Sequence, residues 1–314
     1  MNTANIKRVA CIGAGTIGSS WAAYFVTKGI SANIQDINDE ILKKAEEQIM
    51  GHLRSLLVYG VINEEQMQES RKLLKFTTNI SEAVSDVEFI QESVLERYDV
   101  KEKIIEEVDK YTSDKVIYAS SSSGLLATRL QQYSKYPDRV LVAHPFNPPH
   151  LIPLVEIVKG KASEESVQTA ASFYKSIGKI PIIINKEVPG HVANRLQAAI
   201  WRECIDLVLN GVCSVKDVDS AVCYGPGLRW ALMGPNMIFH LGGGDKGING
   251  FLSQLQGSFE TWLADMATWD IFPDDTGEIL ASGLKEEIGT NTINDITKWR
   301  DSKLINILKD LNLI

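Results

Sequence analysis

Positive charge is in short supply in this sequence. Its 314 residues include 32 Lys and Arg against 40 Asp and Glu, which gives a formal net charge of −8 at pH 7. Nucleic acids and anionic lipids attract proteins with a basic surface. The balance therefore argues against a nucleic-acid partner and against attraction to a membrane, but it says little about the charge of a substrate.

Cysteine and long apolar runs are also scarce. The four cysteines, at positions 11, 204, 213 and 223, lack the paired spacing of a metal site, so we expect no metal. No apolar run approaches membrane-spanning length, and the polar residues 1–5 leave no room for a signal peptide. We expect a globular protein of the reducing cytoplasm without a membrane anchor.

The sequence does contain an apolar run, residues 7–12, that breaks into Gly13-Ala14-Gly15-Thr16-Ile17-Gly18. This pattern predicts a buried parallel strand, a sharp turn at Gly13 and a helix over about 16–28. Gly15 leaves space for a pyrophosphate near the backbone, and Gly18 lets the helix pack closely on the strand. The N–H groups of the first helical residues, including Thr16 and Ile17, would then bind the phosphates.

A second apolar run, residues 30–34, leads to Asp36. Asp36 lies about twenty residues beyond the glycines, where dinucleotide-binding folds place an acid that binds ribose hydroxyls. The acid favours NAD over NADP, because a 2′-phosphate would meet a like charge and Ile37 follows in place of an arginine. A solvated turn is the alternative for Asp36, but the combined pattern predicts an NAD site.

Strand and helix patterns alternate as far as about Asn185. This order is typical of an α/β fold with a Rossmann-type, doubly wound and mostly parallel sheet. The pattern leaves open whether the strands from Ile152 onward are antiparallel. Helical patterns dominate after Pro189-Gly190, so we predict an NAD-binding domain over residues 1–187 and an all-helical domain over residues 188–314. The apolar content of the second domain favours a homodimer through it.

Polar side chains stand at the ends of two predicted strands and within a third. Ser121-Ser122-Ser123 and His144 follow apolar runs, and Pro145 should end the strand at His144. Glu156 interrupts another apolar run, where a lone carboxylate is unfavourable, so we expect it to pair with His144 and raise the pKa of the imidazole. An imidazole suits the base of an alcohol dehydrogenation. Spacing alone also allows a structural His144, an exposed Glu156 at a sheet edge, and a serine turn.

These segments, in this order, resemble the 3-hydroxyacyl-CoA dehydrogenase family. The resemblance rests on the glycine motif, on Ser121-Ser122-Ser123, on His144-Pro145-Phe146-Asn147-Pro148, on Pro153-Leu154-Val155-Glu156 and on Pro189-Gly190-His191-Val192-Ala193-Asn194-Arg195-Leu196. It implies an N-terminal NAD domain and a helical, dimerising C-terminal domain. It also implies the roles of single residues: His144 as the catalytic base, Glu156 as its partner, Ser123 and Asn194 as holders of the substrate oxygen, and Glu96 and Lys101 as cofactor contacts. Ser121 and Ser122 are chemically equivalent to Ser123 for this role.

One segment departs from the acyl-CoA members of the family. Arg229-Trp230 is inserted before Met233-Gly234-Pro235, which resembles the branch of L-gulonate 3-dehydrogenase, lambda-crystallin and L-carnitine dehydrogenase. That branch implies a small free 3-hydroxy acid as substrate, bound through Arg229 and Trp230. An arginine can hold a free carboxylate in a bidentate pair, which a thioester cannot form. A salt bridge to the other domain or to a second subunit is the alternative for Arg229.

The expected reaction is NAD-dependent oxidation of the 3-hydroxyl of a carnitine-like or gulonate-like acid. The quaternary ammonium of carnitine needs an aromatic cage. The helical region offers five aromatic residues, which helical spacing alone would place in the core: Trp201, Trp230, Phe251, Trp262 and Trp269. A CoA ester such as 3-hydroxybutyryl-CoA is the rival substrate. A crystallin-like structural protein is a third interpretation, against which the complete catalytic set argues.

Overall fold

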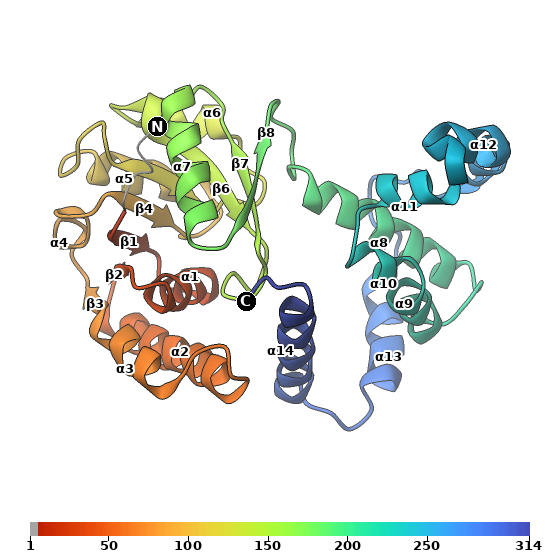
Figure 1. Cartoon of the computed structure of the whole chain (residues 1–314), viewed down its shortest axis with the longest axis horizontal. Coiled ribbons are helices and arrows are strands. Elements are labelled where there is room, and N and C mark those ends of the chain that lie inside the picture. Colours follow the sequence, from red (N-terminus) through yellow and green to blue (C-terminus); the bar gives the residue numbers. More distant parts are fainter. Residues whose placement is uncertain (1–5) are drawn as a thin grey trace. The chain divides into compact units, whose positions relative to one another are not determined.

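The computed structural model describes residues 6–314, which form two compact units (Figure 1). The first unit contains the chain up to Asn194 together with residues 300–314, and the second contains residues 195–299. Helix α14 (Ile293–Asp310) begins in the second unit and ends in the first, where Ile305 and Leu308 join the hydrophobic core. The division at residue 187 stays a prediction.

The first unit is organised around an eight-stranded sheet with the order β3-β2-β1-β4-β5-β6-β7-β8. This order confirms the predicted doubly wound, mostly parallel fold. The open question about antiparallel strands is settled, because β7 runs antiparallel to β6 and β8 runs parallel to β7. The strands are β1 (Arg8–Ile12), β2 (Ser31–Gln35), β3 (Leu74–Thr77), β4 (Phe89–Glu92), β5 (Ile117–Ser120), β6 (Val140–Pro145), β7 (Leu154–Val158) and β8 (Ile180–Ile184).

Helices cover both faces of this sheet. Successive strand residues point to opposite faces, so Val9 and Cys11 join one core cluster while Ala10 and Ile12 join the other. The first cluster includes α1 (Thr16–Thr27), α2 (Asp39–Val58), α3 (Glu64–Lys72) and α7 (Glu164–Ser176). The second includes α4 (Ile80–Val84), α5 (Tyr98–Val108) and α6 (Ala127–Leu130).

Local sequence signals explain where these helices begin. The side chain of Asn38 accepts a hydrogen bond from the backbone N–H of Ile41 at 2.9 Å, which caps α2. The buried side chains of α2 then recur at helical spacing: Leu42, Ala45, Ile49, Leu53 and Leu56. Capping and amphipathic spacing thus agree along this helix.

The second unit is helical. Its helices are α8 (Ala193–Leu209), α9 (Val215–Tyr224), α10 (Pro226–Trp230), α11 (Pro235–Gly242), α12 (Gly247–Asp265), α13 (Thr276–Ile288) and the first part of α14. The helical character predicted for this region is confirmed. The short helix α10 carries Arg229 and Trp230.

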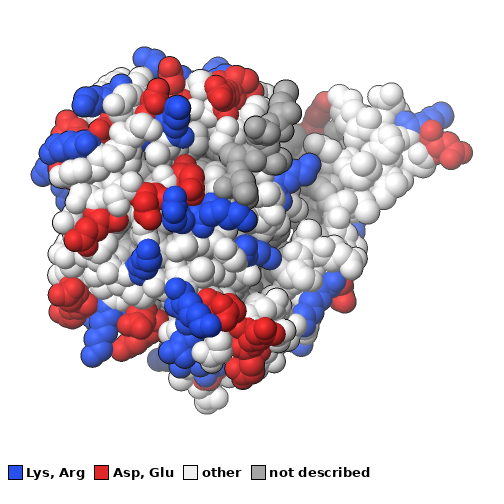
Figure 2. Space-filling model, turned by 60° about the vertical axis from the view of Figure 1, so that its left-hand side comes forward, with Lys and Arg blue, Asp and Glu red and all other residues white. Residues whose placement is uncertain are grey.

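Charge is spread rather than concentrated on the molecular face shown in Figure 2. Acidic and basic side chains alternate there without a broad field of one sign. Within residues 6–314, no helix combines the length and apolar character needed to cross a membrane.

The turn between β1 and α1 is so tightly packed that backbone atoms contact one another directly. Gly13 has a φ of +90°, a conformation that favours glycine. A Cβ at Gly18 would lie 1.8 Å from the carbonyl oxygen of Gly13, whereas a Cβ at Gly15 would have no neighbour within 4 Å. Gly18 therefore serves close packing, and Gly15 keeps space open above the loop.

We expect Gly18→Ala to lower the free energy of unfolding by about 3 kcal/mol, because the added methyl group overlaps backbone that cannot move aside. Gly15→Ala is the matched control and should cost less than about 1 kcal/mol. Urea denaturation of both variants checks this. Equal losses of stability would contradict the packing argument.

Candidate active site

His144 and Glu156 face each other across neighbouring strands. They are direct partners in the antiparallel register of β6 and β7. The expectation that Pro145 ends the strand at His144 is wrong, because β6 continues through Pro145. Strand β5 ends opposite Val142, so beyond that residue β6 pairs only with β7. Pro145 therefore lacks a neighbouring strand on its β5 side, where its missing N–H costs no hydrogen bond.

His144 presents one ring nitrogen to Glu156, and the other nitrogen has no hydrogen-bond partner among the described residues. Its Nδ1 lies 2.8 Å from Oε2 of Glu156. Since a carboxylate only accepts hydrogen bonds, Nδ1 carries the hydrogen, and in the uncharged ring the lone pair is then on Nε2. No hydrogen bond within residues 6–314 engages Nε2, although the residue is only 6% exposed. This tautomer is the one that a general base acting through Nε2 requires.

Glu156 is fully buried, so the alternative of an exposed edge residue is wrong. Strand β8 covers the outer side of β7. Its Oε1 accepts hydrogen bonds from the backbone N–H groups of Val192 and Ala193, both at 2.9 Å. Burial raises the pKa of Glu156, but these N–H groups and His144 outweigh burial and hold the pKa below its ordinary value. Glu156 is therefore a carboxylate near neutral pH.

The three serines after β5 have different surroundings. The Ser121 hydroxyl lies 2.8 Å from both Gln91 Nε2 and Ser93 Oγ. Ser122 is buried, and only Ser123 is exposed. Of the three, Ser123 is thus the one whose side chain is accessible.

Glu96 holds the serine loop in place. Its Oε1 accepts hydrogen bonds from the Ser122 hydroxyl at 2.7 Å and from the backbone N–H groups of Ser123 at 2.7 Å and Gly124 at 3.0 Å. Burial raises the pKa of Glu96, but the Ser122 hydroxyl, the Lys101 ammonium and these N–H groups hold it below its ordinary value. The carboxylate therefore acts as a permanent anchor of the loop.

Lys101 is buried beside this anchor. Its ammonium lies 2.6 Å from Oε1 of Glu92 and 3.6 Å from Oε2 of Glu96. Glu92, which also accepts a hydrogen bond from Ser120 at 2.6 Å, was not predicted as part of the site. Its position as the last residue of an apolar strand was the available signal.

Asn194 reaches the same loop from the start of α8. Its Nδ2 donates to the carbonyl oxygen of Ser123 at 3.1 Å, which leaves the second amide hydrogen available. The structure thus brings four predicted residues of the first unit, His144, Glu156, Ser123 and Asn194, into one connected arrangement.

Arg229 and Trp230 belong to the helical unit. Arg229 is exposed and forms no ion pair within the described residues. The indole nitrogen of Trp230 is buried and has no hydrogen-bond partner in the same part of the chain.

The glycine turn has the features of a nucleotide site. Gly15 caps α1 without a side-chain hydrogen bond, and the first turn of α1 has no acidic residue, which suits an anionic phosphate. Asp36 accepts hydrogen bonds from the N–H groups of Ala14 and Ile37, each at 2.7 Å. Each carboxylate oxygen retains accepting capacity for a ribose hydroxyl. The residues present therefore fit NAD.

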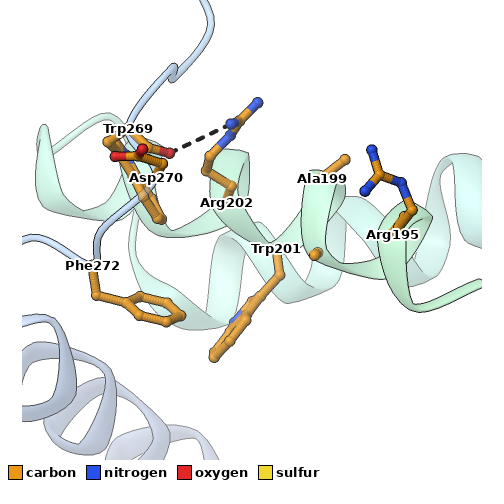
Figure 3. Close-up of a pocket in the computed structure, with 8 residues that line it drawn as sticks. Arg195, Ala199, Trp201, Arg202, Trp269, Asp270 and Phe272 are labelled. Atoms are coloured by element: carbon orange, nitrogen blue, oxygen red, sulfur yellow. Dashed lines mark hydrogen bonds between the residues drawn. The ribbon is translucent and has the colours of Figure 1, made fainter. Parts of the chain in front are cut away.

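A pocket of about 450 Å³ lies within the helical unit (Figure 3). The ring of Phe272 lies between two others, with its centre 5.5 Å from Trp201 and 5.8 Å from Trp269. Arg195, Arg202 and Asp270 also line it. Two of the five predicted cage aromatics therefore meet here, whereas Phe251 and Trp262 both pack against Phe259.

Comparisons with known proteins show which family the chain belongs to. The family model for the 3-hydroxyacyl-CoA dehydrogenase NAD binding domain matches residues 8–188, and the model for the C-terminal domain matches residues 190–281. An L-carnitine dehydrogenase of Bacillus cereus is 36% identical over 98% of this chain and 94% of its own. A 3-hydroxyacyl-CoA dehydrogenase of Gibberella moniliformis is 37% identical over 98% of this chain and 95% of its own. The solved structure of an NAD⁺-dependent 5-formyl-3-hydroxy-2-methylpyridine 4-carboxylic acid 5-dehydrogenase superposes with a TM-score of 0.82, at 27% identity over 98% and 99% of the two chains.

The lowered pKa of Glu156 predicts how stability depends on pH. A carboxyl group whose pKa is lower in the folded state stabilises the fold above its unfolded value of about 4.3, and this contribution disappears as pH falls through the folded pKa. We expect Glu156→Gln to lower the free energy of unfolding by about 2 kcal/mol at pH 7. The difference from wild type should shrink below about pH 4.

Denaturation at a series of pH values measures this difference. Glu165→Gln, on the exposed surface of α7, is the control and should stay near wild type throughout. A deficit of Glu156→Gln that is unchanged at low pH would contradict the assignment of a buried carboxylate.

Proposed function

The chain belongs to the 3-hydroxyacyl-CoA dehydrogenase family of NAD-dependent dehydrogenases, and we propose that it oxidises the 3-hydroxyl of a small free 3-hydroxy acid to the 3-oxo acid. The observation that carries this proposal is the His144–Glu156 pair, with Nε2 of His144 left free of hydrogen bonds within the described residues. A Gln or Asn partner would not fix that tautomer, since an amide can also donate.

His144 acts as the base in this proposal. The substrate O–H proton moves to Nε2 of His144, the hydrogen on C3 leaves as hydride, and the C3–O bond becomes a carbonyl. NAD supplies the hydride acceptor. Glu156 is ionised and stabilises the imidazolium that forms, because opposite charges 2.8 Å apart favour the charged ring. In the reverse direction the imidazolium is the acid.

Ser123 and Asn194 polarise the reacting oxygen. The second amide hydrogen of Asn194 is available for it, and the exposed Ser123 hydroxyl must exchange its long, 3.2 Å bond to Glu96 for one to the substrate. Well-aligned donors of this kind contribute about 2–4 kcal/mol each to a transition state. Glu96 keeps its bonds to the loop backbone during this exchange and so preserves the loop conformation.

The glycine turn, Asp36, Glu96 and Lys101 are proposed to bind the cofactor. The N–H groups of Thr16 and Ile17 at the start of α1 would bind the pyrophosphate, and Asp36 would accept hydrogen bonds from the ribose. The open space above Gly15 supports the first of these roles.

A charged, compact substrate is favoured by two features of the helical unit. Arg229 is exposed and has no ion-pair partner in the described chain, so it is available for a carboxylate. The pocket in Figure 3 combines aromatic faces and Asp270, which suit a quaternary ammonium, with two arginines, which suit an anion. Together with the carnitine dehydrogenase relatives, this supports a betaine-like hydroxy acid over a gulonate-like one.

A CoA ester is the second candidate substrate, and the Gibberella relative named 3-hydroxyacyl-CoA dehydrogenase favours it. Such a substrate has a thioester in place of the carboxylate, so Arg229 would have no charged group to bind at C1. The two candidates therefore differ in their response to the loss of Arg229.

We expect NAD reduction with L-carnitine or L-gulonate in a screen that also contains L-3-hydroxybutyrate and L-3-hydroxybutyryl-CoA. Arg229→Met should raise KM for the free acid about 10- to 100-fold, the equivalent of roughly 1.5–3 kcal/mol for a charged hydrogen bond. Lys216→Met, which removes an exposed cation from the same unit, should leave KM unchanged.

His144→Gln completes this experiment and should bind NAD normally while losing most turnover. Turnover of the CoA ester alone, unaffected by Arg229→Met, would favour the second candidate. Turnover that survives His144→Gln would place the base elsewhere.

We further propose that two copies associate through the helical unit. Several of its large apolar side chains are more than half exposed: Leu228, Leu232, Met237, Leu241, Trp262 and Leu263. A monomer rarely leaves so much apolar surface in water, and a two-fold interface is the commonest way to cover it.

Sedimentation equilibrium should therefore give twice the mass of one chain. Leu263→Glu is expected to shift the protein toward monomer, because it would bury a charge in the interface. Val58→Glu, at an equally exposed apolar position in the first unit, should remain a dimer. A monomeric wild type would refute the association.

A further inference from the structure

Four consecutive residues, His191 to Asn194, connect the two halves of the candidate site. The inner two, Val192 and Ala193, donate their backbone N–H groups to Glu156. The outer two use their side chains on the serine loop: His191 Nε2 lies 3.1 Å from the carbonyl oxygen of Ser122, and Asn194 Nδ2 lies 3.1 Å from that of Ser123. One short segment thus fixes both the partner of the base and the loop that carries Ser123.

The backbone at His191 has an unusual conformation. Its φ is +53°, and that of the preceding Gly190 is +75°. Residues other than glycine rarely adopt this left-handed conformation, and when they do they cluster at functional sites. The turn directs the next two N–H groups to Glu156, so the strained position has an identifiable use.

The His191 side chain is buried, with 1% exposed, and lies beside the base. Its ring centre is 5.4 Å from that of His144. Because Nε2 faces a carbonyl oxygen, it must carry the hydrogen, and Nδ1 is left as a buried acceptor without a partner among the described residues. Burial lowers the pKa of His191, and the neighbouring His144 lowers it further. The hydrogen bond to the Ser122 carbonyl raises it, but the net shift is downward, so the ring is uncharged at neutral pH.

We propose that His191 is a positioning residue for the dehydrogenation, which holds the serine loop in register with the His144–Glu156 pair through its bond to Ser122. This inference rests on the proposed function. Ser123 is the next residue after the tethered carbonyl, so loss of the tether displaces the donor that meets the substrate oxygen. A displacement of about 1 Å at a reacting group lowers the rate by up to about 100-fold.

His191→Phe and His191→Gln are the test variants. Phe retains a ring of similar size but cannot donate to Ser122, while it also removes the unpartnered Nδ1. Gln places an N–H near the position of Nε2 and restores the donor. We expect kcat for the hydroxy acid to fall about 10- to 100-fold in His191→Phe. In His191→Gln, kcat should stay within about fivefold of wild type, because the restored hydrogen bond keeps Ser123 close to its wild-type position.

The accompanying measurements separate positioning from folding. The dissociation constant for NAD and the melting temperature should change little in both variants. A merely structural role would instead lower the melting temperature together with kcat. Wild-type kcat in His191→Phe would overturn the inference. So would equal losses of kcat in both variants, or a fall in kcat that follows a fall in melting temperature.

If His191→Phe does not fold, His191→Met, which also lacks a donor, takes its place in the same comparison with His191→Gln. A wild-type enzyme that oxidises none of the 3-hydroxy substrates would instead refute the proposed function. That outcome is distinct from an active wild type whose His191 variants are unaffected.

Discussion

The buried carboxylate of Glu156 is the constraint on which the rest of the site depends. A charge removed from water must be fully paired, and Glu156 takes its partners from two parts of the chain. One is His144, directly opposite on β6, and the other is the backbone that opens α8. The antiparallel reversal of β7 in an otherwise largely parallel sheet makes the first contact possible. The left-handed turn at residues 190–191 makes the second possible.

A second network of charged groups, built around the buried Glu92 and Lys101, supports the serine loop. Glu92 at the end of β4 binds Lys101 and Ser120, and Glu96 binds the serine loop through two N–H groups and two hydroxyls. Lys101 lies within 4 Å of both carboxylates. The loop that carries Ser123 is therefore held by carboxylates on one side and by the His191–Asn194 segment on the other. Such pre-organisation lowers the reorganisation needed when charge develops at the substrate oxygen.

Much of this could be predicted from local pattern. The doubly wound, mostly parallel sheet follows from alternating strand and helix periods, and the pairing of His144 with Glu156 follows from the high free energy of a lone carboxylate in an apolar strand. Features that depend on tertiary partners could not. The continuation of β6 through Pro145 reflects where β5 happens to end. The anchoring role of Glu96 and the tether at His191 require loops far apart in sequence to meet. The roles of the site residues remain predictions.

The path of the chain has a consequence for how the protein unfolds. The polypeptide leaves the sheet-containing unit after Asn194 and returns to it at Arg300, so the helical unit is an insertion secured at both ends. Two uninterrupted helices, α8 and α14, cross these junctions. Fraying of either helix would remove N–H donors from Glu156 or apolar contacts of Ile305 and Leu308 from the core. Local unfolding of either helix would therefore reach residues of both units, in contrast to domains joined by one flexible linker.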